Sequence, residues 1–156
     1  MNKAIALLAA SSALLSPALA LAREVTLTTT MNNNVGGGAY LAIYLTDAAG
    51  AYQGTLWVGG GKAKYYRHLP DWYRATGADP SQIDGITGAS VGAGRSLTVT
   101  VDLAEALIDA GYQIRIDTSV EDGRDVSSDI AVDLTTAGSG TETAGRSYVA
   151  AFRYDM

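Results

Sequence analysis

The sequence contains no cysteine, one histidine and one phenylalanine. Without cysteine the chain has no disulfide framework, no thiolate metal site and no cysteine nucleophile. A metal centre built on imidazoles requires a second histidine, and a serine hydrolase would have to use His68 with a carboxylate that the sequence does not identify. We therefore expect no catalytic residue and no metal site, and we do not expect this chain to turn over a substrate by itself.

Positive charge is also scarce, because 11 basic residues face 16 acidic ones and the net charge is −5 at pH 7. A surface of that sign repels nucleic acid and anionic lipid. After residue 22 no apolar run approaches the roughly 18 residues that span a bilayer. The composition thus predicts neither nucleic-acid binding nor membrane insertion.

Residues 1–22 have the features of a secretory signal peptide. Lys3 precedes an apolar run too short to span a bilayer, and Ala20 and Ala22 supply the small residues of a cleavage site. No cysteine for a lipid anchor and no twin arginine is present. We expect cleavage after Ala22, export to the periplasm, and one domain over residues 23–156.

The rest of the chain is dominated by short segments in which apolar and polar residues alternate with a period of two. Such alternation is typical of antiparallel strands with one buried face. Clusters of Gly, Asn, Asp and Ser separate the segments and predict turns. The expected fold is an all-β, immunoglobulin-like antiparallel sandwich. Its seven strands would occupy residues 23–31, 39–47, 52–61, 95–103, 112–120, 129–136 and 146–155.

Helical signals are confined to two places, so we expect one or two short helices. Residues 67–77 contain Pro70 at a first turn and Gly77 as a stop. Residues 102–111 have Asp102 as a possible cap and Gly111 as a terminator. The polar segment 135–147 is rich in small residues and predicts a mobile loop.

Four stretches follow in order the landmarks of a bacterial periplasmic family. They are AYLAIYLTD (39–47), GTLWVGGGKAKYYRHLPDWYR (54–74), DGITGASVGAGRSLTVTVD (84–102) and AGYQIRIDTSVEDGRDVS (110–127). Together they resemble domain of unknown function 2271, a family that implies a secreted β-sandwich with no assigned activity. The chain departs from the family at Val101-Asp102-Leu103, where the family has a Trp-Asp-Gly turn.

A second resemblance lies within residues 84–90, DGITGAS. This stretch is similar to the acceptor sequence on which an extracytoplasmic FMN transferase attaches FMN, and the resemblance implies a phosphoester on the last hydroxyl, Ser90. The tail of that motif is missing, because Ala93 stands where a further hydroxyl is expected. The matching positions are Asp84, Thr87, Gly88, Ala89 and Ser90.

The same dipeptides, Asp-Gly and Thr-Gly, also occur in ordinary turns, so a purely structural loop is the competing interpretation. Noncovalent ligand binding is a third. If flavin is attached, nearby aromatic residues are expected to hold the ring, and arginines to pair with the phosphate. The candidates are Trp72, with Trp57, Tyr65, Tyr66 and Tyr73, for the ring, and Arg95, with Arg67, for the phosphate. The competing roles are core anchors for the tryptophans and a solvated charge for Arg95.

His68 precedes Leu69-Pro70 and is either a functional imidazole or a structural one that caps a helix or hydrogen-bonds a carbonyl. The acidic segment 121–129 lacks the spacing of a calcium loop and is better explained as a charged hairpin turn. Two hypotheses for the whole chain follow. One is an electron carrier with covalent FMN on Ser90, with an FMN transferase and a membrane redox partner. The other is a β-sandwich binding or scaffold module without a cofactor.

Overall fold

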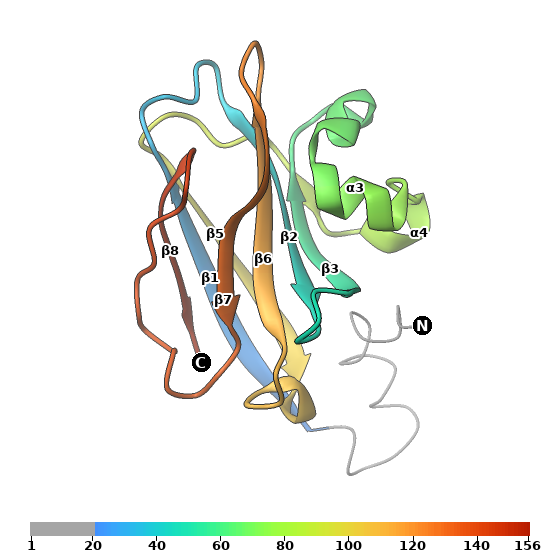
Figure 1. The fold of residues 1–156 in the computed structure, drawn as a ribbon, viewed down its shortest axis with the longest axis vertical. Helices are drawn as coiled ribbons and strands as arrows, with labels where there is room; N and C mark the ends of the chain where they lie inside the picture. The colour runs from blue at the N-terminus through green and yellow to red at the C-terminus, as the bar shows by residue number, and fades with distance from the viewer. Residues whose placement is uncertain (1–20) are drawn as a thin grey trace.

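The structure, a computed structural model that describes residues 21–156, is a sandwich of two β-sheets with short helices on one outer face (Figure 1). The predicted signal peptide lies almost entirely outside the described residues, and the first strand begins at Ala22, the expected cleavage point. Of the described residues, none forms a helix both long and apolar enough to cross a bilayer. The predicted all-β sandwich is confirmed.

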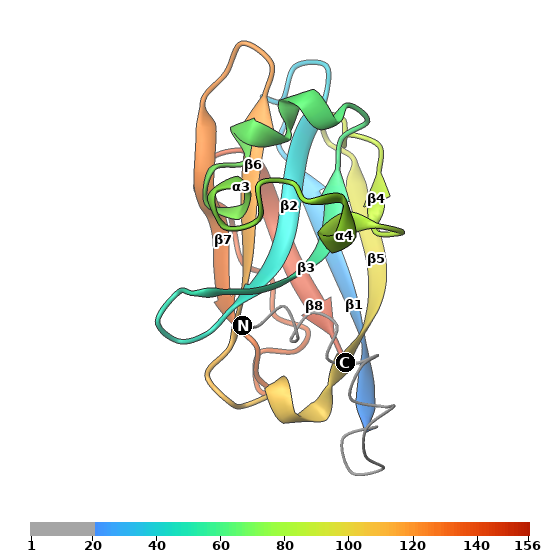
Figure 2. The same ribbon diagram turned by 90° about the vertical axis from the view of Figure 1, so that its right-hand side faces the viewer.

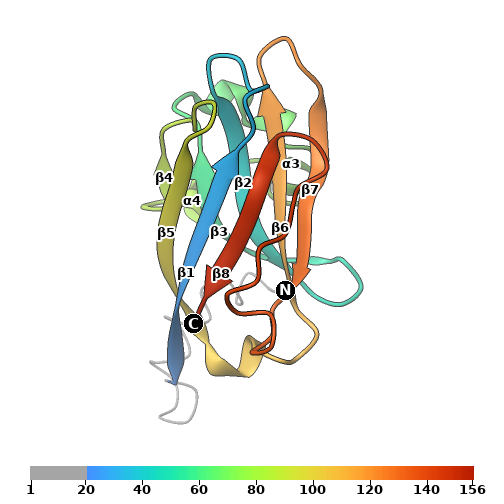
Figure 3. The ribbon, with the colours of Figure 1, turned by 90° about the vertical axis from the view of Figure 1, so that its left-hand side faces the viewer.

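Three strands form the smaller sheet, in the order β5-β1-β8 (Figure 3). They are β1 (Ala22–Met31), β5 (Ser96–Ala104) and β8 (Val149–Asp155), and both pairings are antiparallel. Strand β1 shows the alternation that its sequence predicts. Val25, Leu27 and Met31 are buried against the second sheet, and Thr26 and Thr28 lie on the outer face.

Five strands form the larger sheet, in the order β4-β3-β2-β6-β7. They are β2 (Ala39–Thr46), β3 (Tyr52–Gly59), β4 (Thr87–Gly88), β6 (Gln113–Val120) and β7 (Asp125–Asp133). The short β4 was not predicted, and it pairs with β3 in parallel. Strand β7 starts four residues before the predicted position.

Strand β2 is buried on both faces. Leu41, Ile43 and Leu45 point into the core between the sheets, and Ala42 and Tyr44 belong to a second apolar cluster on the outer side. A helical segment covers that outer side (Figure 2). It consists of η2 (Ala63–His68), α3 (Pro70–Thr76) and α4 (Pro80–Ile83). Pro70 begins α3 and Gly77 ends it with a φ of 61°, as the sequence predicts.

The prediction of a helix over residues 102–111 is wrong. Strand β5 continues to Ala104, and only a single 3-10 turn, η3 (Glu105–Leu107), follows. The first part of the segment pairs with β1, since Leu103 lies opposite Arg23 and Ala104 opposite Ala22. Strand pairing and burial of Leu103 and Ala104 outweigh the local helical signal.

The loop between β7 and β8 contacts the sandwich at several points. Thr143 forms a bridge with Phe152, and the buried carboxylate of Asp129 accepts hydrogen bonds from the backbone N–H groups of Ser147, Tyr148 and Val149. Asp129 also accepts from the Thr118 hydroxyl at 2.9 Å. This carboxylate therefore anchors the C-terminal end of segment 135–147, which the composition predicts to be a mobile loop.

Candidate functional site

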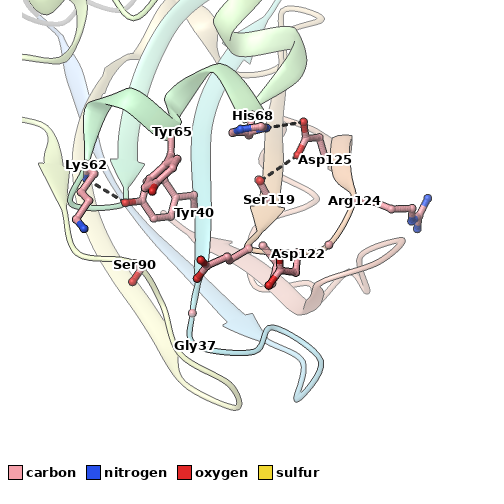
Figure 4. Close-up of a pocket in the computed structure, with 14 residues that line it drawn as sticks. Gly37, Tyr40, Lys62, Tyr65, His68, Ser90, Ser119, Asp122, Arg124 and Asp125 are labelled. Carbon is pink, nitrogen blue, oxygen red and sulfur yellow. Dashed lines mark hydrogen bonds and ion pairs between the residues drawn. The ribbon is translucent and has the colours of Figure 1, made fainter.

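A cavity of about 790 Å³ opens at one end of the sandwich, next to the segment that carries η2 (Figure 4). Four parts of the chain form its wall: the start of β2, the η2 segment, the residues after β4, and the turn from β6 to β7. The volume lies within the range of small-molecule and cofactor sites. The lining residues are Gly37, Gly38, Tyr40, Lys62, Tyr65, His68, Ser90, Ser119, Val120, Glu121, Asp122, Gly123, Arg124 and Asp125.

Ser90 lies in this wall and its side chain is exposed. Backbone hydrogen bonds hold the chain on both sides of it. The Gly60 N–H donates to the Gly88 carbonyl at 2.8 Å, and Ala39 and Val91 exchange two bonds of 2.8 and 3.0 Å. The Ser90 hydroxyl is therefore a reachable group on a loop whose two ends are fixed to the larger sheet.

Two glycines of this region lie close to neighbouring side chains, and Gly38 also has a φ of +134°, which L side chains rarely adopt. A Cβ on Gly88 would lie 2.8 Å from Cζ2 of Trp57, and a Cβ on Gly38 would lie 3.0 Å from the Ser90 Oγ. Packing against Trp57 thus explains why residue 88 is a glycine, independently of any attached group. The remaining motif residues outside the pocket wall, Asp84, Thr87 and Ala89, are exposed.

The aromatic residues of the pocket are Tyr40 and Tyr65. Their ring centroids are 6.0 Å apart in an edge-to-face arrangement, and the Tyr40 hydroxyl accepts a hydrogen bond from the Lys62 N–H at 2.9 Å. Tyr65 is 39% exposed, and the ammonium of Lys64 lies 5.0 Å from its ring centroid. Tyr65 was among the predicted ring contacts, whereas Tyr40, which lies far from Ser90 in the sequence, was not.

His68 forms the far side of the pocket together with the start of β7. Its Nδ1 lies 3.0 Å from Oδ2 of Asp125, and the other oxygen of that carboxylate accepts from the Ser119 hydroxyl at 3.1 Å. Figure 4 shows His68 between Tyr65 and Asp125. The acidic residues 121–125 form a hairpin turn, and among the described residues no group of three or more His, Cys, Asp or Glu side chains is arranged to hold a metal ion.

Trp72 does not belong to this site, and its prediction as a flavin contact is corrected. The indole is fully buried beneath α3, and its Nε1 donates to the Thr55 hydroxyl at 2.9 Å. The backbone N–H of Trp72 donates to the buried carboxylate of Asp117 at 2.8 Å, and Asp117 also accepts from the Tyr44 hydroxyl. No ring face of Trp72 is open to a ligand.

Burial dominates the electrostatics of this inner network. It raises the pKa of the Asp117 carboxyl, while hydrogen bonds from Ser128, Trp72 and Tyr44 act in the opposite direction. Burial, together with the neighbouring Asp117, also raises the pKa of the Tyr44 hydroxyl far above its usual range. These groups stabilise the attachment of the helical segment and do not face the pocket.

The predicted phosphate partners, Arg95 and Arg67, are both exposed and are not part of the pocket wall. The cations in the wall are Lys62 and Arg124, and the side chain of Arg124 points away from the cavity in Figure 4. Lys62 was missed by the sequence reasoning. Its place directly after Gly59-Gly60-Gly61, where a strand ends next to the site, was the signal that could have found it.

The sequence profile of one protein family matches residues 22–151, and that family is described as a predicted periplasmic protein, DUF2271. The chain belongs to this family. The match covers the larger sheet, the helical segment, every residue of the pocket wall and the smaller sheet except the last four residues of β8, 152–155. No curated protein and no solved structure matches the chain significantly.

Proposed function

We propose that this member of the DUF2271 family is a periplasmic electron carrier that holds FMN covalently on Ser90. The observation that carries the proposal is the place of the Ser90 hydroxyl, which is exposed, fixed on both sides by backbone hydrogen bonds and located in the wall of a cofactor-sized cavity. A side chain placed in this way is accessible to a modifying enzyme and leaves space beside it for the attached group.

The residues of the pocket fit such a group. Tyr65 and Tyr40 offer aromatic surface for a flat, three-ring system, which prefers to stack on or abut aromatic side chains. Lys62 offers a cation for a phosphate near Ser90. When bound, the flavin supplies one- and two-electron redox chemistry, and the protein positions it and shields part of it from water.

The attachment step is the transfer of an FMN group from flavin adenine dinucleotide by a transferase. The Ser90 oxygen forms a new bond to the FMN phosphorus, the bond between the two phosphates breaks, and adenosine monophosphate leaves with that electron pair. The hydroxyl proton goes to a base of the transferase, since His68, the only histidine of the sequence, is paired with Asp125. Export through a signal peptide cut after Ala22 brings the chain to the compartment where its family is placed.

The test is to purify the exported protein from cells that also express an extracytoplasmic FMN transferase, and to record its intact mass and its visible spectrum after denaturation. We expect the intact mass of a chain that starts at Arg23 and carries one FMN group. The flavin absorption band should stay with the denatured chain.

The matched variants are Ser90→Ala and Thr87→Ala, which remove the two hydroxyls of the stretch one at a time. We expect the first to abolish the added mass and the second to keep it. An unshifted mass in the unmodified sequence would overturn the proposal and leave a cofactor-free binding module. Loss of the added mass in Thr87→Ala alone would move the attachment to Thr87.

A further inference from the structure

His68 is the only histidine of the chain, and the fold places it in the pocket wall opposite the segment that carries Ser90. It comes from η2, and its partner Asp125 comes from the start of β7, 57 residues later. Both oxygens of Asp125 are engaged, one by His68 at 3.0 Å and one by the Ser119 hydroxyl at 3.1 Å. The carboxylate is thus held in one orientation toward the imidazole.

This arrangement fixes which nitrogen of the ring titrates. An ionised carboxylate has no proton to donate, so Nδ1 of His68 carries the hydrogen of the bond to Asp125. The free electron pair of the neutral ring is then on Nε2, which is the atom that gains and loses a proton. The His68 side chain is 40% exposed, so that proton exchanges directly with water.

Several charged and titratable groups share the pocket wall with His68 or, in the case of Arg67, precede it in the sequence, and their signs nearly balance. The acidic groups come from the β6–β7 turn and the start of β7, the phenols come from β2 and η2, and the cations come from η2 and the turn. They are Glu121, Asp122 and Asp125; Tyr40 and Tyr65; and Lys62, Arg67 and Arg124. His68 is the one imidazole among these groups, and imidazole is the side-chain type whose charge responds to its surroundings near neutral pH.

We propose that His68 is the proton-exchanging residue of this pocket, and that binding of a proton at its Nε2 is coupled to reduction of the flavin on Ser90. The inference rests on the proposed function. For two electrons delivered by the redox partner, two protons enter from solvent, one to the flavin ring and one to Nε2 of His68. The net charge of the pocket is then unchanged, and both protons return to solvent when two electrons leave.

The coupling acts in both directions, because linkage between two binding equilibria is reciprocal. Reduction increases the proton affinity of His68, and protonation of His68 raises the midpoint potential of the flavin. Between the pH at which His68 titrates in the oxidised protein and the higher pH at which it titrates in the reduced protein, one further proton accompanies two electrons. The potential in that interval should fall by about 30 mV more per pH unit than outside it.

The direct test follows His68 itself. Protein labelled with ¹⁵N-histidine and purified without a histidine tag gives the ring signals of one residue only. Samples whose intact mass shows one FMN group are titrated in the oxidised state and after reduction with dithionite. We expect the reduced protein to bind the His68 proton about tenfold more tightly, a rise of about one pH unit in the midpoint. Identical midpoints in the two states would overturn the proposal.

Variants give a second measurement, the dependence of the midpoint potential on pH. His68→Gln should remove the steeper interval, and Asp125→Asn should shift it because the orienting carboxylate is lost. Arg153→Gln is the control, since it removes an exposed positive charge on β8, outside the pocket wall and outside the set of groups named around His68, and it should leave the interval unchanged. If the midpoint potential of His68→Gln depends on pH in the same way as that of the unmodified chain, this inference is wrong and the proposed function still stands. If the intact mass shows no FMN group, both are wrong.

Discussion

Residues 62–76 contain two groups of side chains with opposite surroundings. One group, which includes Lys62, Tyr65 and His68, borders the pocket and is largely accessible to water. The other group, Tyr66, Leu69 and Trp72, packs on the outer face of the larger sheet and is between 0% and 4% exposed. The buried group attaches the segment to the sheet, and this attachment is what holds the exposed group in place around the cavity.

The carboxylates that meet this segment show the same contrast. Asp117 is fully buried and accepts from the Tyr44 hydroxyl and from two backbone N–H groups. Asp125 lies at the pocket, is 39% exposed and has room for exchange with water. Both carboxylates have their oxygens engaged, so burial is what separates them: Asp117 is enclosed and structural, whereas water still reaches Asp125.

Replacement of Trp72 by alanine tests the buried group and has the largest expected effect on stability. Trp72→Ala should lower the free energy of unfolding by about 3–5 kcal/mol, because it leaves a large cavity and removes the hydrogen bond that the indole N–H donates to the Thr55 hydroxyl. Tyr73→Ala is the control, since Tyr73 is the next residue and is 37% exposed. Urea unfolding measures both. Equal stability of the two variants would mean that Trp72 is not the anchor of the segment.

Asp117→Asn tests the buried carboxylate. The amide has one acceptor oxygen for donors that approach from both sides of the carboxylate, so we expect a loss of about 2 kcal/mol at neutral pH. The dependence on pH should change as well. Burial raises the pKa of Asp117 in the folded chain, so its contribution to stability is fully present below its unfolded pKa of about 3.9 and is lost as the pH rises through the folded pKa.

That decrease with pH should be absent in Asp117→Asn, and unfolding curves at a series of pH values provide the comparison. Asp109 and Asp155 have lowered pKa values, caused mainly by hydrogen bonds from Thr136 and Arg153, and they act in the opposite direction. Their contribution is the same in both proteins and cancels in the difference. A difference that does not vary with pH would contradict the assigned role of Asp117.

Gly88→Ala separates packing from recognition at the proposed acceptor stretch. The new methyl group would lie 2.8 Å from the Trp57 ring, so the variant should lose about 1–2 kcal/mol. Gly37→Ala is the control on the other side of the pocket, because a Cβ there meets no atom within 4 Å. If unfolding of Gly88→Ala is unchanged while FMN attachment is lost, the glycine serves the transferase and not the fold.

The sandwich could be predicted from the sequence because each strand carries its own alternation and its own turns. The strands over 39–46 and 113–120 match their predicted positions almost residue for residue. The prediction of a helix at 102–111 was wrong because it used only the local sequence pattern. Pairing with β1 determines the structure of the first residues of this segment, 102–104. Contacts across the sheet are invisible to a local pattern.

The site could be predicted only in part for the same reason. Ser90 was singled out by a contiguous motif, and its exposure agrees with the role proposed for it. The pocket around it joins segments far apart in the chain, so Tyr40, Lys62 and Asp125 were not connected with Ser90 by sequence alone. Trp72 was assigned to the site because it is close in sequence and aromatic, but an aromatic residue on a short helix packs inward when the sheet below it is apolar.

Ser90→Ala has the smallest expected effect on stability and the most complete effect on the proposed function. The side chain is exposed and its hydroxyl has no hydrogen bond to another described residue, so the free energy of unfolding of the FMN-free protein should stay within about 0.5 kcal/mol of the unmodified chain. Ser90→Thr keeps a hydroxyl and should still accept FMN, as judged by intact mass. A loss of stability in Ser90→Ala as large as that in Gly88→Ala would instead show that the serine belongs with the buried, structural group, since a residue kept only as an attachment point has no reason to stabilise the fold.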